Sequence, residues 1–134
     1  MTQKKSLMNN EKWEQMSDVA WKHRENARIL GKTKVGAAGL SGGEVFGGCN
    51  IEHKFRSHDI HAEIAAISSM ISSGNTKLDA ILIVAERTKF TPCGSCLDWI
   101  FEFGGPKCIV GYQTKKNGKT TIFKAEELMP HYPS

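Results

Sequence analysis

The chain has 134 residues and a mass of 14.8 kDa, which is the length of one domain with a hydrophobic core of its own. Its 40% hydrophobic and 24% charged residues exclude a disordered tail and a coiled coil. The net charge of +4 arises without a dense basic block, so charge gives no sign of nucleic-acid binding. Four cysteines are compatible with two disulfides, a metal site or buried thiols, and composition does not choose between them.

No segment has the pattern of an export signal or a membrane span. The basic pair Lys4-Lys5 is followed by polar residues rather than by an apolar region. The longest apolar run, residues 80–85, is far too short to cross a membrane. We therefore expect a cytoplasmic protein with no membrane partner and with reduced thiols, which makes disulfides an unfavoured use of the cysteines.

The first half of the chain predicts a helix followed by a strand hairpin. Residues 1–9 are expected to be frayed, and Asn10 is a suitable N-cap for a helix that fades around 28–31. The Ser-Gly-Gly turn at 41–43 joins two short strands, and a polar irregular stretch follows. The predicted ranges are helix 10–28, strands 35–40 and 44–49, and irregular segment 50–59.

The second half alternates helices and strands. The spacing of Ile64, Ile67 and Ile71 indicates a helix with one buried side, and the apolar run after it indicates a strand covered on both faces. Pro92 stands where a further helix begins. The predicted ranges are helix 61–73, strand 78–85, a helix from 92, strands 107–112 and 120–123, and a short helix 125–129.

This order of elements predicts an α/β fold, a three-layer domain over residues 1–134 with a mixed five-stranded sheet. Only residues 113–120 join the last two strands, which is too short for the dozen or so residues of a helical crossover. Asn117-Gly118 within this connection is a strong hairpin signal. The last two strands are therefore predicted to be antiparallel.

Two short motifs carry the chemistry: His61-Ala62-Glu63 and Pro92-Cys93-Gly94-Ser95-Cys96. A lone Cys-x-x-Cys is a weak signal, because it also occurs in redox pairs. Together with an upstream His-x-Glu it is similar to the signature of zinc nucleobase deaminases.

The residue types suit a catalytic zinc site, which needs three protein ligands and one position for water. Cys93 and Cys96 lie three apart on one helix, so both sulfurs face the same way, and His61 opens the other helix. Glu63 is better placed to carry protons from the zinc-bound water to the substrate than to act as a fourth ligand. A redox pair, a capping histidine and a first-turn carboxylate are the alternatives for these residues.

The remaining cysteines and one further histidine have simpler interpretations. Cys49 and Cys108 fall in predicted strands and are expected to be small buried side chains. His58, three residues before His61, is either an accessory ligand or, as we expect, a solvated loop residue.

Beyond the zinc motifs, the chain resembles the cytidine deaminase family over residues 35–130. The resemblance rests on Val35-Gly36-Ala37-Ala38, Gly48-Cys49-Asn50-Ile51-Glu52 and Glu127-Leu128-Met129-Pro130. It implies a three-layer α/β/α fold, one zinc ion per subunit, and hydrolysis of cytidine or deoxycytidine to the uracil form. It also implies a small-molecule nucleoside substrate and a homotetramer, or a dimer.

The resemblance carries four further roles onto this sequence. Asn50 and Glu52 would hold a ribose hydroxyl, the Thr91 carbonyl would accept from the leaving amino group, and the Ala62 amide would meet the pyrimidine carbonyl. Family members with three thiolates have Arg directly after the catalytic Glu. In this chain Ile64 occupies that position, and His61 replaces one of the three Cys. The two changes agree, because one negative charge and one compensating cation are missing together.

The sequence leaves the substrate open. Thr33 stands where the family has a base-packing Phe, and His53-Lys54-Phe55-Arg56 and Leu97-Asp98 also depart from its pattern. Either Phe55 or Tyr132 then supplies the aromatic contact and Arg56 meets an anionic group, or these side chains lie on the surface. The alternatives are a nucleic-acid-acting or purine deaminase of the same superfamily, which the predicted antiparallel strands disfavour, and a zinc-binding module without turnover.

Overall fold

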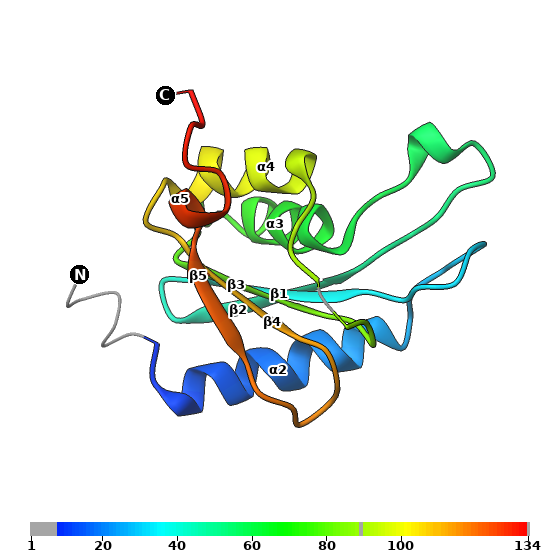
Figure 1. Cartoon of the computed structure of the whole chain (residues 1–134), viewed down its shortest axis with the longest axis horizontal. Coiled ribbons are helices and arrows are strands. Elements are labelled where there is room, and N and C mark those ends of the chain that lie inside the picture. The colour runs from blue at the N-terminus through cyan, green and yellow to red at the C-terminus, as the bar shows by residue number, and fades with distance from the viewer. Residues whose placement is uncertain (1–7, 89, 134) are drawn as a thin grey trace.

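The computed structural model describes residues 8–88 and 90–133, which form a mixed five-stranded sheet between helices (Figure 1). The strand order is β2-β1-β3-β4-β5. The strands are β1 (Gly36–Ser41), β2 (Glu44–Cys49), β3 (Ala80–Val84), β4 (Ile109–Gln113) and β5 (Thr121–Lys124). The helices are α2 (Asn10–Arg24), the 3-10 turn η1 (Arg56–His58), α3 (Ala62–Ser72), α4 (Gly94–Gly104) and α5 (Ala125–Leu128).

The strand directions confirm the predicted topology. β1 pairs with β2 and with β3 in antiparallel fashion, and β3 pairs with β4 in parallel. β4 and β5 are antiparallel, with Gly111 opposite Ile122. Asn117 in the connecting turn has a φ of 61°, a left-handed conformation that Asn tolerates better than most residues.

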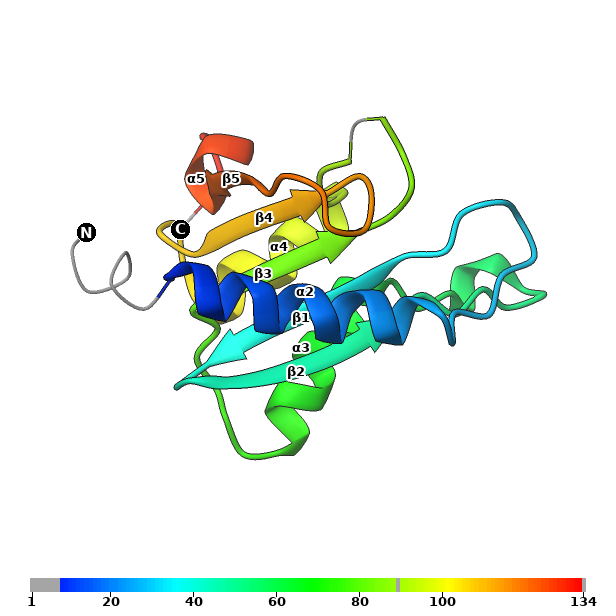
Figure 2. The ribbon, with the colours of Figure 1, turned by 90° about the horizontal axis from the view of Figure 1, so that it is seen from below.

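The three layers follow from the residues of the central strand. Ile81 and Ile83 of β3 pack into a core beneath α3 and α4, whereas Leu82 and Val84 pack against α2 on the opposite face. All five residues of β3 are buried, as expected for a strand covered on both faces. Figure 2 shows α2 lying along one side of the sheet. α3 and α4 cover the opposite side of the sheet.

The first helix differs from its predicted range. It ends at Arg24 rather than near 28–31, because Arg28 leaves the helix to pair with Ile51, with Glu52 N–H donating to the Arg28 carbonyl at 2.7 Å. The N-cap is Asn9 rather than Asn10, and its side chain accepts from Lys12 N–H at 2.9 Å. The other predicted elements are present with ends shifted by at most two residues, and β2 has the predicted bounds.

The expected frayed start concerns residues 1–9, of which 1–7 lie outside the described residues. Within the described part of the chain, no helix combines the length and apolar character needed to cross a membrane.

Candidate metal centre and pocket

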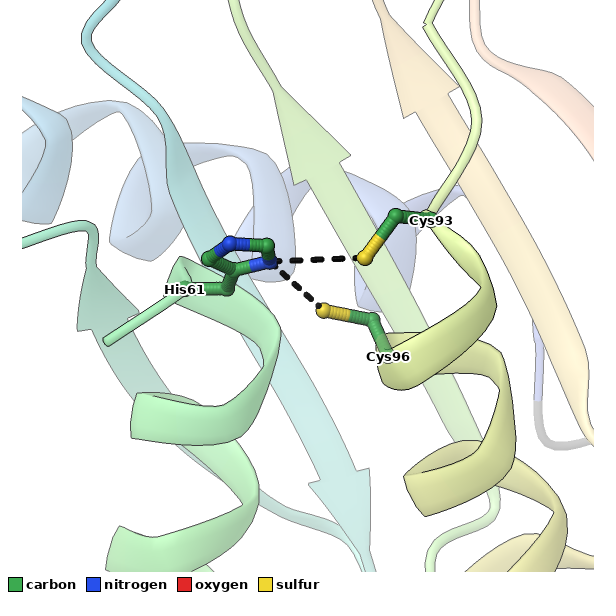
Figure 3. Close-up of side chains that lie close together, drawn as sticks. All are labelled: His61, Cys93 and Cys96. Carbon is green, nitrogen blue, oxygen red and sulfur yellow. Dashed lines mark hydrogen bonds between the residues drawn. The ribbon is translucent and has the colours of Figure 1, made fainter. Parts of the chain in front are cut away.

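Three side chains with metal-binding atoms converge between two helix N-termini (Figure 3). His61 immediately precedes α3, Cys93 immediately precedes α4, and Cys96 lies in the first turn of α4. The Nδ1 atom of His61 lies 3.3 Å from the Cys96 sulfur and 3.4 Å from the Cys93 sulfur. All three potential ligand atoms lie within 4.8 Å of one another, so one ion could contact them all.

The local backbone explains this convergence. His61 and Cys93 are both extended N-cap residues whose carbonyls accept the first bond of their helices, from Ala65 N–H at 3.0 Å and Leu97 N–H at 2.9 Å. The side chains of His61 and Cys93 therefore lie at the N-terminal ends of α3 and α4 and not along the sides of these helices. The positive ends of the two helix dipoles therefore favour negative charge on the thiols.

The donor set fits a divalent cation. Burial raises the pKa of the Cys96 thiol, and the neighbouring Glu63 and Cys93 raise it further. Two thiolates beside a carboxylate are therefore unfavourable without a positive charge between them, and a dication supplies that charge. Two sulfurs and an imidazole nitrogen are ligands typical of zinc, with room for a fourth ligand.

Glu63 lies in the first turn of α3, and only 4% of its surface is exposed. Burial raises the pKa of its carboxyl, while His61 and the Cys96 thiol work in the opposite direction. A buried carboxyl whose pKa is raised is a stronger base than an ordinary carboxyl, which suits it to take up a proton.

A pocket of about 740 Å³ adjoins the metal ligands, within the usual size range of small-molecule sites. Its wall contains seven of the eight residues singled out from the sequence, and the eighth, Cys96, is buried behind them. The seven are Asn50, Glu52, His61, Ala62, Glu63, Thr91 and Cys93. The structure thus brings together all the predicted site residues, while their individual roles stay predictions.

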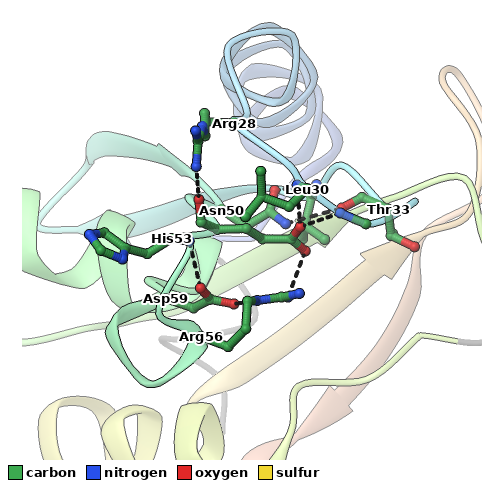
Figure 4. Close-up of polar contacts among 10 residues, drawn as sticks. Arg28, Leu30, Thr33, Asn50, His53, Arg56 and Asp59 are labelled. Carbon is green, nitrogen blue, oxygen red and sulfur yellow. Dashed lines mark hydrogen bonds and ion pairs between the residues drawn. The ribbon is translucent and has the colours of Figure 1, made fainter.

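The side chains of Asn50 and Glu52 have structural partners that the sequence did not indicate (Figure 4). The amide oxygen of Asn50 accepts from Val35 N–H at 2.9 Å, and its nitrogen donates to the Thr33 carbonyl at 3.1 Å. Glu52 Oε1 accepts from the backbone N–H groups of residues 30 and 31, at 2.6 and 2.7 Å. Both side chains therefore fix the 30–35 segment that forms part of the pocket wall.

The electrostatics of Glu52 follow from those bonds. The N–H groups of Gly31 and Leu30, and then the Arg56 guanidinium, hold the pKa of the Glu52 carboxyl below its usual range. The Glu52 carboxylate thus stays ionised to lower pH than an ordinary Glu.

The aromatic wall of the pocket comes from residues that the sequence analysis did not single out. Phe90, Tyr112 and Phe123 line it, and the last two stack with ring centres 6.4 Å apart. The proposed substitutes lie elsewhere: Phe55 stacks on His53 at 5.7 Å, and Tyr132 stacks on Phe101 at 4.2 Å. Phe90 stands directly before Thr91-Pro92-Cys93, so its place in the pocket wall could have been predicted from the sequence.

The other thiols and histidines lie outside the cluster. Cys108 is buried beside β4, as predicted, whereas Cys49 in β2 is half-buried rather than buried. His58 packs its ring edge-on against His53, with 4.9 Å between centres, and is not one of the three clustered ligands.

The fold and the site define a mixed α/β domain with a candidate thiol–imidazole metal centre at two helix N-termini. The family model described as "Cytidine and deoxycytidylate deaminase zinc-binding region" matches residues 10–112. The chain belongs to this family.

Individual relatives agree with the family match. The chain is 32% identical over 101 residues to a probable cytidine deaminase of Dictyostelium discoideum, covering 72% of this chain and 69% of that protein. It is 34% identical over 102 residues to cytidine deaminase 6 of Arabidopsis thaliana, but spans only 35% of that longer relative. The crystal structure of cytidine deaminase from Burkholderia pseudomallei matches with a TM-score of 0.81 and 29% identity, over 92% of this chain and 98% of that one.

Proposed function

We propose that the protein is a zinc-dependent hydrolase that deaminates a cytosine nucleoside, cytidine or deoxycytidine or an analogue, to its uracil form and releases ammonia. The observation that carries this proposal is the meeting of His61, Cys93 and Cys96 beside the buried Glu63, at the edge of a ligand-sized pocket. The family match and the relatives named cytidine deaminase support it.

His61, Cys93 and Cys96 would hold one zinc ion per subunit. Zinc, when bound, supplies a Lewis acid that makes water nucleophilic near neutral pH. These three ligands leave a fourth position open, as a catalytic site requires. The alternative is a zinc-binding module in which the same ligands have a structural role and no turnover occurs. An activity assay distinguishes the two.

Glu63 would carry the proton. Its carboxylate would take one proton from the water that attacks C4 of the cytosine ring and pass it to ring nitrogen N3. It would then take the second proton from the new C4 hydroxyl and pass it to the leaving amino group. The new C4–O bond replaces the C4–N bond, so cytidine and water become uridine and ammonia. Burial of Glu63 suits this role, because a raised pKa makes its carboxylate a stronger base towards the attacking water.

Other pocket residues would orient the nucleoside. Ala62 is the first residue of α3, where a backbone N–H has no intrahelical acceptor, and it would donate to the pyrimidine carbonyl. The Thr91 carbonyl would accept from the amino group, and Asn50 and Glu52 would hold a ribose hydroxyl. Phe90 would offer an apolar contact for the base in the absence of a Phe at position 33.

A small substrate is favoured over a nucleic acid. The antiparallel β4–β5 hairpin replaces the helix and parallel strand of the RNA-acting branch, and the sequence has no dense basic block. An RNA-acting enzyme would bind single strands with strong salt dependence, which separates the two possibilities.

We further propose an oligomeric state and a cellular location for the protein. We infer one zinc domain over residues 1–134, a homotetramer or dimer, and a cytoplasmic role in pyrimidine salvage. Exposed apolar side chains, among them Leu30 and Ile51, support self-association, and thiol ligands suit a reducing compartment. Light scattering of the purified protein tests the assembly.

The proposal is tested by ammonia release from zinc-loaded protein, measured over cytidine, deoxycytidine, their monophosphates, adenosine and guanine. We expect ammonia from at least one cytosine nucleoside and none from adenosine or guanine. Zinc-loaded, folded protein that releases no ammonia from any of these compounds would overturn the proposed activity.

A further inference from the structure

Arg56 is the basic side chain that contacts the proposed sugar-binding carboxylate. It lies in η1, lines the pocket, and is 57% exposed. Its Nε atom donates to Asp59 Oδ2 at 2.8 Å, and its Nη2 atom lies 3.3 Å from Glu52 Oε2 (Figure 4). The planar guanidinium therefore bridges two carboxylates with two different nitrogens.

The two oxygens of Glu52 are used differently. Oε1 accepts two backbone N–H bonds, from Leu30 and Gly31, which saturates its lone pairs. Oε2 is the oxygen beside Arg56 and is the one with acceptor capacity left for a ligand hydroxyl. The contact with Arg56 thus fixes the orientation of the oxygen that a sugar would use.

The charges around Arg56 decide what it can recognise. One guanidinium faces two carboxylates, those of Glu52 and Asp59, so this cluster has a net negative charge. These two acids offset the positive charge of the Arg56 guanidinium and would repel an anion placed against it, whereas the other basic side chains of the pocket wall, Lys32 and Arg87, have no part in this cluster. A neutral hydroxyl meets no such repulsion.

We propose that Arg56 is a positioning residue, which orients Glu52 Oε2 for a neutral sugar hydroxyl and thereby selects nucleosides with free hydroxyls. This inference rests on the proposed function. It reverses the expectation from sequence that Arg56 binds an anionic group, because the structure gives the guanidinium two acidic partners within the chain.

Arg56→Ala, Arg56→Lys and Glu52→Gln test this role, with cytidine compared against 2′,3′-dideoxycytidine, which lacks two hydroxyls. Because the ion pair is exposed, we expect Arg56→Ala to raise the KM for cytidine about twofold to fivefold with little change in kcat. The KM for the dideoxy compound should not change. Arg56→Lys should restore part of the lost affinity, since it keeps the charge without the fork.

A double variant separates positioning from direct contact. If Arg56 acts through Glu52, Arg56→Ala adds nothing to the effect of Glu52→Gln. Lys107→Ala is the matched control, because Lys107 pairs with Glu126 at 2.7 Å on the surface and does not line the pocket. Its KM should equal that of the parent.

Binding of cytidine, measured by calorimetry on a Glu63→Gln background, keeps this test separate from turnover. If the zinc-loaded parent, with Glu63 intact, binds cytidine without releasing ammonia, the proposed function is contradicted, and the binding data still report on Arg56. Equal losses for cytidine and the dideoxy compound would overturn the positioning role. A loss confined to cytidine 5′-monophosphate would also overturn it, since Arg56 would then be an anion receptor.

Discussion

Ile51 and Ile60 exchange two backbone hydrogen bonds, with N···O distances of 2.8 and 2.9 Å, and so close the loop between them. Glu52 follows Ile51 in the chain, and His61 follows Ile60. This bridge therefore fixes the spacing between the proposed sugar-binding carboxylate and the candidate metal ligand. The sugar end and the metal end of the pocket are in this way built from one closed loop.

The bridge gives the first prediction. Ile60→Pro removes the N–H that donates to the Ile51 carbonyl, and the bridge cannot form intact. We expect a lower zinc content in the purified variant and a higher KM for cytidine, because both flanking residues lose their fixed spacing. Elemental analysis and steady-state kinetics measure the two effects.

Ile60→Ala is the matched control, because it keeps the backbone N–H and shortens a side chain that is already 41% exposed. It should retain the zinc content of the parent. Equal zinc contents and KM values in the proline and alanine variants would show that the bridge does not position the site.

Zinc should stabilise the folded chain, because its ligands come from two separate helices that unfolding would separate. Zinc at 100 times its dissociation constant adds about 2.7 kcal/mol, which a chelator should remove as a fall in Tm. Cys93→Ala should lose this zinc-dependent shift, whereas Cys49→Ala, in β2, should keep it. A Cys93→Ala protein with the full zinc-dependent shift would exclude Cys93 as a ligand.

Close packing of β2 on α3 predicts a cost for Gly48→Ala. A Cβ atom there would lie 2.5 Å from the Ala66 nitrogen and 2.9 Å from the Ala62 carbonyl oxygen. Backbone atoms cannot rotate away, so we expect a loss of about 1–3 kcal/mol in the free energy of unfolding, measured in urea.

Gly94→Ala provides the comparison, because a Cβ atom on Gly94 meets nothing within 4 Å and alanine favours helix. Its stability should equal or exceed that of the parent. If the two alanine variants were equally stable, the contact between β2 and α3 would be looser than the structure indicates.

Glu52 predicts a particular dependence of stability on pH. Its carboxyl has a pKa below the ordinary value of 4.5 in the folded state, so its ionised form is bound more favourably there than in the unfolded chain. The resulting stabilisation is complete above that ordinary value and is lost as the pH falls through the lowered pKa. Urea unfolding of the parent and of Glu52→Gln, from pH 7 down to pH 3, should show their stability difference shrinking with acid.

Glutamine keeps an oxygen that accepts from Leu30 and Gly31 but has no charge to titrate, so the comparison isolates the ionisation. Loss of zinc in acid should affect both proteins alike, because Glu52 is not one of the candidate metal ligands. A stability difference that stayed constant across this range would mean that the Glu52 carboxyl titrates normally.

Local patterns predicted much of the fold. The spacing of Ile64 and Ile67 indicated α3, and Asn117-Gly118 indicated the final hairpin, because each signal involves residues close in sequence. The metal ligands were predicted as well, since two motifs with known chemistry carry all three.

Long-range backbone contacts could not be predicted in this way. The early end of α2 results from pairing of Arg28 with Ile51, and any residue can offer a backbone carbonyl. The acidic partners of Arg56 depend likewise on the turn at η1. The aromatic wall formed by Tyr112 and Phe123 depends on the register of β4 with β5, which no local pattern specifies.

The deaminase activity and the role of Glu63 are tested together by measuring ammonia and uridine formed from cytidine by the zinc-loaded parent and by zinc-loaded Glu63→Gln. We expect equal amounts of ammonia and uridine from the parent, and a loss of at least about 100-fold in kcat for the variant with its zinc content unchanged. A Glu63→Gln protein as active as the parent, or a zinc-loaded parent that forms neither product, would contradict this expectation.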